Sequence, residues 1–131
     1  MHKLILEKIP LLFGSFFGLT AVVLGAFGAH VLSTIFSDSQ MTIFETATRY
    51  QMYHALILCC IGFFLLHNEN KLLYYSSYSF IVGIILFSFS LYCYLALNIT
   101  LIAIITPIGG LFLITGWIIL FYFALSFVGN S

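Results

Sequence analysis

Four long apolar segments, separated by short polar connections, constrain this chain more than any other feature. They cover residues 9–32, 44–66, 72–97 and 101–128. The first has no charged residue and would be about 36 Å long as a helix, which exceeds the roughly 30 Å hydrocarbon core of a bilayer. Hydrophobic residues make up 63% of the chain and charged residues 6%, too few polar side chains to cover a soluble domain. We therefore predict a single membrane domain over residues 1–131, an all-α, antiparallel four-helix transmembrane bundle.

The basic residues favour one orientation of this bundle. Lys3, Lys8 and Lys71 fall at the same predicted end, whereas the connections at the opposite end contain no lysine or arginine. Positively charged connections stay in the cytoplasm, so the pattern predicts a multi-pass protein of the inner (cell) membrane with both termini cytoplasmic. The formal net charge is +0 and there is no basic run, which argues against a nucleic-acid partner.

Small residues recur along the first predicted helix at spacings of four, three, four and three, so they share one face. Such a stripe lets another helix approach closely, and close packing is what holds helices together in lipid. Each glycine weakens an isolated helix by up to about 1 kcal/mol relative to alanine, so the stripe needs a packing reason. We expect a helix–helix seam along Gly14, Gly18, Ala21, Gly25 and Gly28.

The second segment begins with a cluster of polar side chains that is unusual for membrane depth. Glu45, Arg49 and Tyr53 share one face, and Gln51 and His54 lie on roughly the opposite face. A helix that is polar on two sides cannot present both to lipid, so we expect it to be enclosed by the other three helices, or the bundle to form oligomers. The predicted buried cluster, in the outer leaflet, comprises His30, Glu45, Arg49, Tyr50, Gln51, Tyr53 and His54.

Two helix starts carry recognisable local signals. Thr42 and Glu45 fit a capping box, although Asp38 or Ser39 could cap an earlier lead-in. At the start of the fourth segment, Pro107 bends or restarts the helix, and Gly109 and Gly110 expose its backbone.

The sequence offers no recognisable catalytic or metal chemistry. Cys59, Cys60 and Cys93 have neither metal-site nor redox-pair spacing and read as small buried apolar residues. Two histidines, His30 and His54, without a nearby carboxylate or thiolate set make a poor metal site. No nucleophile and base are paired by spacing, so we predict a protein that is not an enzyme and needs no cofactor.

Three segments carry a resemblance to a known family. Residues 25–30, 48–56 and 106–110 resemble the signature segments of the YgdD-like small membrane proteins, a family catalogued as of unknown function. The resemblance extends over essentially the whole chain and implies a four-span protein of bacterial inner membranes, without implying an activity. The residues that match its motifs are His30, Arg49, Tyr50, Gln51, His54, Pro107, Gly109 and Gly110.

Three functions are compatible with these features. The first is a structural or interaction component of the membrane, with lipids as partners and with a second copy or another membrane protein as a further candidate. The second is a small-solute or proton pathway using His30, Arg49 and His54, which the apolar run Ala55–Ile61 disfavours. The third is an anion or lipid-headgroup site in which Arg49 and the start of the fourth helix face a phosphate.

Overall fold

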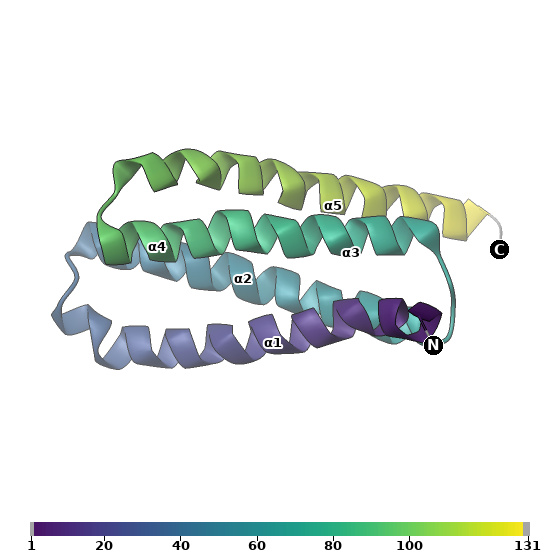
Figure 1. Ribbon diagram of the computed structural model, residues 1–131, viewed down its shortest axis with the longest axis horizontal. Coiled ribbons are helices and arrows are strands. Elements are labelled where there is room, and N and C mark those ends of the chain that lie inside the picture. The colour runs from purple at the N-terminus through teal and green to yellow at the C-terminus, as the bar shows by residue number, and fades with distance from the viewer. Residues whose placement is uncertain (1, 130–131) are drawn as a thin grey trace.

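The computed structural model describes residues 2–129, and the side-chain surroundings of residues 8–102 and 104–129. No strand occurs in this part of the chain, and four antiparallel rods confirm the predicted all-α bundle (Figure 1). A π-helical segment, η2, joins two of the α-helices into one continuous rod, and short 3₁₀ segments, η1 and η3, lie in two connections. The elements are α1 (His2–His30), η1 (Leu32–Thr34), α2 (Asp38–Leu65), α3 (Lys71–Ile84), η2 (Ile85–Phe89), α4 (Ser90–Leu97), η3 (Thr100–Ile104) and α5 (Ile105–Gly129).

The helices form two hairpins, α1 with α2 and the continuous α3–η2–α4 helix with α5, and the hairpins pack against each other mainly through α2. α1 packs mainly on α2, and α5 packs mainly on α3, while α2 also contacts α3, η2 and α4. The start of α1, the end of α5 and the α2–α3 connection lie at one end of the molecule (Figure 1). The α1–α2 and α4–α5 connections lie together at the other end, as an antiparallel arrangement requires.

The outer surface suits a lipid environment. In the described residues, three helical stretches are long and apolar enough to cross a membrane: Lys8–Thr34, Lys71–Leu97 and Thr100–Gly129. α2 has a comparable 28 residues, but its polar side chains keep it out of this group. Large apolar side chains such as Leu111 and Phe121 are 64% and 66% exposed, which acyl chains tolerate and water does not.

The first residues of α2 differ from the predicted helix start. α2 begins at Asp38, because the Ser37 side chain accepts from the Gln40 backbone N–H and the Gln40 side chain accepts from the Ser37 backbone N–H. The predicted Thr42–Glu45 capping box is wrong. Thr42 is already inside the helix, where its hydroxyl donates to the Asp38 carbonyl at 2.9 Å.

The small-residue stripe of α1 lies against α2. A methyl group on Gly14 would come within 2.8 Å of the Cys59 backbone nitrogen, so this position requires glycine. Gly28 faces the ring of Phe44 just as closely. Added methyl groups on Gly18 and Gly25 would meet their nearest neighbours at ordinary contact distances, 3.9 and 3.8 Å, so these two positions do not need glycine for packing. Ala21, within the same stripe, is 2% exposed.

The start of α5 packs on the π-helical segment. Pro107 is the third residue of α5, in the first turn, where a missing backbone N–H costs no intrahelical hydrogen bond. A methyl group on Gly109 would run into the backbone of Leu86 and Phe87, whereas Gly110 has 3.8 Å of clearance from the Phe87 ring. Gly109 therefore allows α5 to reach η2 at backbone contact.

Candidate functional site

Gln51 connects three helices from the centre of the bundle. Its side chain is fully buried, at 0% exposed. Nε2 donates to the Phe17 carbonyl at 2.9 Å and to Thr20 Oγ1 at 2.7 Å, both on α1. Oε1 accepts from the Tyr92 hydroxyl on α4 at 2.9 Å, and this hydroxyl also lies 3.2 Å from Thr48 Oγ1. Both amide donors and the amide oxygen of Gln51 are thus engaged within the protein.

His54 is held at both ring nitrogens. Trp117 Nε1, which can only donate, lies 3.1 Å from His54 Nε2, so Nε2 is the acceptor. Nδ1 therefore carries the proton and donates to the Tyr50 carbonyl at 2.6 Å. The ring is 4% exposed and packs 5.4 Å, centroid to centroid, from Phe80. This arrangement suits a neutral structural imidazole that links α2 to α5.

Serine hydroxyls join the remaining helices. Ser76 donates to the Gly116 carbonyl at 2.9 Å, and Ser79 donates to the Phe112 carbonyl at 2.7 Å, so two bonds link α3 to α5. Ser88 in η2 is buried and donates to the Ala47 carbonyl of α2 at 2.8 Å. In lipid, hydrogen bonds between helices contribute about 0.6 kcal/mol each on average, so these serines stabilise the bundle collectively.

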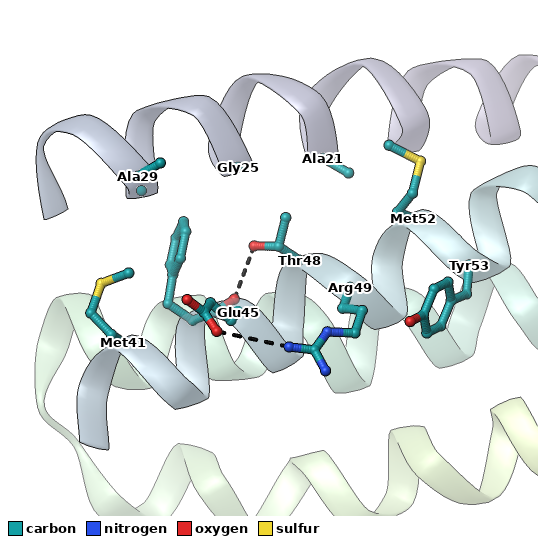
Figure 2. A pocket seen from close by; sticks show the side chains of 11 residues that line it. Ala21, Gly25, Ala29, Met41, Glu45, Thr48, Arg49, Met52 and Tyr53 are labelled. Carbon is teal, nitrogen blue, oxygen red and sulfur yellow. Dashed lines mark hydrogen bonds and ion pairs between the residues drawn. The ribbon is translucent and has the colours of Figure 1, made fainter. Parts of the chain in front are cut away.

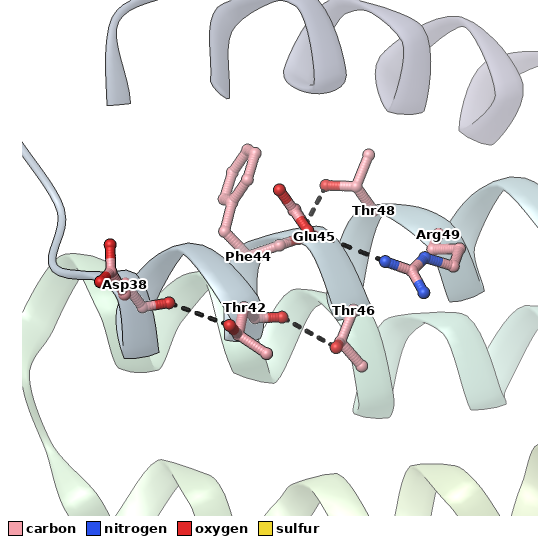
Figure 3. A network of polar contacts seen from close by, with 7 residues as sticks. All are labelled: Asp38, Thr42, Phe44, Glu45, Thr46, Thr48 and Arg49. Carbon is pink, nitrogen blue, oxygen red and sulfur yellow. Dashed lines mark hydrogen bonds and ion pairs between the residues drawn. The ribbon is translucent and has the colours of Figure 1, made fainter. Parts of the chain in front are cut away.

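The buried polar side chains form a network with no unsatisfied member among the described residues. In the described part of the chain, every buried side-chain nitrogen and oxygen has a hydrogen-bond partner. The threonines at the start of α2 are satisfied locally, because Thr42, Thr46 and Thr48 each donate to the carbonyl one turn earlier (Figure 3). The buried polar groups therefore act as internal connections between helices and are not left open for a ligand.

Glu45 and Arg49 lie outside this network. Their side chains are 60% and 56% exposed, and Arg49 Nη2 is 3.8 Å from Glu45 Oε2, a long ion pair (Figures 2 and 3). They belong to an exposed stripe that follows α2 at spacings of three and four residues. We call this stripe the α2 outer face: Thr42, Glu45, Arg49, Tyr53, Leu56, Cys60 and Phe63.

The α2 outer face is flanked by two grooves. One, of about 370 Å³, lies between α1 and α2 and contains the Glu45–Arg49 pair (Figure 2). Its α1 wall is made of small residues, including Ala21, Gly25 and Ala29. We call it the α1–α2 groove. The second, of about 660 Å³, lies on the α5 side, where Trp117 and Tyr53 contribute to its lining.

The predicted polar cluster is not a single enclosed unit. Gln51 and His54 are buried, whereas His30, at the end of α1, is exposed and does not line the α1–α2 groove. Tyr50 and Tyr53 are 40% and 55% exposed. The expectation of a buried cluster is thus wrong for all but two of its members.

Helix packing explains this correction. α5 packs on α3, η2 and α4, and α1 packs on one side of α2, so the other three helices do not enclose α2. The headgroup hypothesis also changes, because the α1–α2 groove is lined by residues of those two helices alone. Neither Pro107 nor Gly110 takes part in it, and Gly110 lines the second groove instead.

Sequence reasoning missed Tyr92, Trp117 and Ser88. Tyr92 and Trp117 pair with residues 41 and 63 positions away, and no local spacing signals such partners. The sequence does show that Tyr92 and Trp117 lie within apolar segments. This alone indicates that each needs a hydrogen-bond partner, because a buried hydroxyl or indole N–H is rarely left unpaired.

No metal centre is present in the part of the chain that the structure describes: no three His, Cys, Asp or Glu side chains gather there. The cysteines are free, with Cys59 half-buried and Cys60 and Cys93 exposed. The expectation that all three are buried is wrong for Cys60 and Cys93, whose helix faces point outward from the bundle.

The sequence is similar to membrane proteins of several bacteria. The profile of a family described as "Protein of unknown function (DUF423)" matches residues 24–110. A UPF0382 membrane protein of Staphylococcus epidermidis is 39% identical over 123 residues, 93% of this chain and 99% of that protein. The UPF0382 inner membrane protein YgdD of Escherichia coli K12 is 35% identical over 111 residues, 85% of each chain. No solved structure matches the chain. This chain belongs to the UPF0382 family of membrane proteins, which confirms the resemblance seen in its motifs.

Proposed function

We propose that this protein is a non-catalytic membrane component that engages a molecule in the plane of the bilayer through the α2 outer face. One observation carries the proposal. The buried polar side chains of the described interior all have hydrogen-bond partners within the protein, whereas the Glu45–Arg49 pair is more than half exposed. The interior polar groups hold the helices together, and the exposed pair remains available to a partner.

The depth of Arg49 supports a partner at this position. Arg49 lies eleven residues beyond the start of α2, about 16 Å along the helix axis. An arginine at the centre of a bilayer costs about 3 kcal/mol on insertion scales, and this cost falls when the charge reaches the interface or finds a counter-charge. Helical side chains tilt toward the N-terminus, so Arg49 is directed toward the nearer membrane surface and toward Glu45.

The alternative of a proton or solute pathway receives less support. The buried residues of α2 that follow His54 are apolar: Ala55, Leu58, Ile61, Gly62 and Leu65. His54 itself is held at both nitrogens. A pathway would need further polar groups in this half of the bundle.

For orientation, we propose that both termini face the cytoplasm, on the basis of Lys3, Lys8 and Lys71 at one end. Single cysteines placed in the α1–α2 connection of a variant without native cysteines would test this in intact cells. Labelling by an impermeant maleimide from outside is expected, and labelling only after the cytoplasm is opened would contradict the orientation.

Photo-crosslinking in native membranes tests the proposed function. A photoreactive residue at Tyr53, on the α2 outer face, is compared with one at Tyr122, which is similarly exposed on α5. We expect a discrete adduct at position 53 that Arg49→Gln diminishes, and only diffuse labelling at position 122. Equal labelling at both positions, unaffected by Arg49→Gln, would overturn the proposal.

A further inference from the structure

We propose that the α1–α2 groove binds the headgroup of a zwitterionic aminophospholipid, with the phosphate at Arg49 and the ammonium at Glu45. This inference rests on the proposed function and names the chemical class of its partner. It follows from the order of charges along α2, from the shape of the groove and from the free hydrogen-bonding capacity of Arg49.

The order of the two charges matches the order of charges in such a lipid. Glu45 and Arg49 are four residues apart, about 6 Å along the helix axis, and Glu45 is nearer the membrane surface. In an aminophospholipid the ammonium lies farther from the acyl chains than the phosphate does. The Arg49 side chain extends toward the membrane surface, so a lipid in the leaflet next to the α1–α2 connection can present its phosphate to the Arg49 guanidinium and its ammonium to Glu45. This correspondence holds whichever side of the membrane that leaflet occupies.

The groove provides an apolar path below the charged pair. The part of the groove that is farther from the membrane surface is lined by Ala21 of α1 and Met52 of α2. The lining residues of α1 are small, so few side-chain atoms project from α1 into the groove (Figure 2). An acyl chain that follows the glycerol group can lie along this path. Because the chain is already in hydrocarbon, the contact adds van der Waals packing against the helices and no hydrophobic transfer energy. From the membrane surface inward, the groove offers a carboxylate, a guanidinium and an apolar wall. These match the ammonium, the phosphate and the acyl chain of one lipid molecule in the same order.

Arg49 retains the donors that a phosphate needs. In the described residues its one ion-pair partner is Glu45, at 3.8 Å, which is beyond hydrogen-bond distance. A guanidinium carries five N–H donors in a planar fork that fits two phosphate oxygens. Phosphate binding therefore does not require Arg49 to give up an existing hydrogen bond, and Glu45 remains free to accept from the ammonium.

The same geometry predicts which headgroup is preferred. A primary ammonium has three N–H donors for the Glu45 carboxylate, whereas the quaternary ammonium of phosphatidylcholine has none. Phosphatidylglycerol has the phosphate but no cation, and it leaves Glu45 beside an anionic lipid. Phosphatidylethanolamine is thus expected to bind more tightly than either of the other two.

Native mass spectrometry of the protein released from nanodiscs tests the inference. The nanodiscs contain equal amounts of phosphatidylethanolamine, phosphatidylcholine and phosphatidylglycerol. We expect one retained phosphatidylethanolamine in preference to the other lipids. Arg49→Gln is expected to reduce its retention about tenfold, as the loss of a charge-assisted hydrogen bond would. Glu45→Gln should remove the preference over phosphatidylcholine, and Lys71→Gln, at the other end of the bundle, should change nothing.

A charge-swapped variant separates lipid recognition from a structural ion pair. The double variant Glu45→Arg with Arg49→Glu keeps both charges on one helix face but reverses their order, so it should lose phosphatidylethanolamine while keeping its melting temperature. Retention that is equal for all three lipids, or that survives the swap, would overturn the inference. So would a dimer that Arg49→Gln dissociates, since a second copy would then occupy the face. In that case the discrete adduct at position 53 would persist, and the proposed function would stand without the lipid. Loss of the adduct would contradict both the proposed function and this inference.

Discussion

Trp117 donates a hydrogen bond of 3.1 Å from its indole Nε1 to Nε2 of His54. This contact fixes the protonation pattern of an imidazole at membrane depth, because the other ring nitrogen must then donate to the Tyr50 carbonyl. A histidine satisfied in this way has no open lone pair for a metal and no free proton for transfer. We therefore assign His54 to the packing of α2 against α5.

The first prediction concerns this tautomer. Nitrogen-15 NMR of His54 in a bilayer should report a neutral ring protonated at Nδ1, with Nε2 unprotonated. Trp117→Phe keeps an aromatic ring near Phe80 but removes the donor, and should lower the free energy of unfolding by about 1 kcal/mol. An Nε2-protonated ring in the unmodified protein would contradict the assignment.

The second prediction concerns the amide of Gln51. Gln51→Leu removes three hydrogen bonds and leaves the Tyr92 hydroxyl with only the longer contact to Thr48, so it should lower the free energy of unfolding by about 2 kcal/mol. Tyr92→Phe should cost about 1 kcal/mol, and the double variant less than the sum of the two. Tyr75→Phe, on an exposed side chain, serves as the control. Additive losses would show that Gln51 and Tyr92 do not interact.

The third prediction uses two adjacent glycines. Gly109→Ala forces a methyl group into the backbone of η2 and should destabilise the protein by about 2 kcal/mol. Gly110→Ala meets nothing closer than 3.8 Å, so it should leave stability unchanged or raise it by up to about 1 kcal/mol through helix propensity. Melting temperatures in one detergent give the comparison, and equal effects would contradict the packing of α5 on η2.

The fourth prediction compares the observed cap of α2 at Ser37 with the predicted capping box at Thr42. Ser37→Ala removes the side chain that accepts from the Gln40 backbone N–H, and should lower the free energy of unfolding by about 1 kcal/mol. Thr42→Ala removes a hydroxyl already inside the helix and should cost no more than about 0.5 kcal/mol. The reverse ranking, measured by thermal unfolding, would restore the later helix start.

The sequence was sufficient for the helices and their antiparallel order. Uncharged runs separated by short polar connections such as residues 67–71 leave an antiparallel bundle as the simple solution in lipid. Gln51 and His54 could be singled out for the same reason, since polar side chains in an apolar run need partners. Their partners could not, because Tyr92 and Trp117 come from distant helices whose rotation and depth are set by packing.

Two of the failed expectations, the capping box at Thr42 and the enclosure of Glu45 and Arg49, have identifiable physical reasons. Ser37 and Gln40 have the same capping-box spacing as Thr42 and Glu45, so the local sequence alone does not decide between the two starts. The enclosure of Glu45 and Arg49 was expected from the cost of charges in lipid. The helices pair instead as two hairpins, which leaves this face of α2 open.

The hydrogen bonds from Gln51 to α1 also bear on how the chain enters the membrane. α2 is the least apolar of the long helices and presents an unsatisfied amide if it leaves the translocon alone. Entering as a pair with α1, it brings that amide to the Phe17 carbonyl and the Thr20 hydroxyl. Both partners of the Gln51 amide nitrogen thus precede α2 in the chain, so insertion of α1 and α2 as one hairpin would satisfy this donor before the rest of the chain is synthesised.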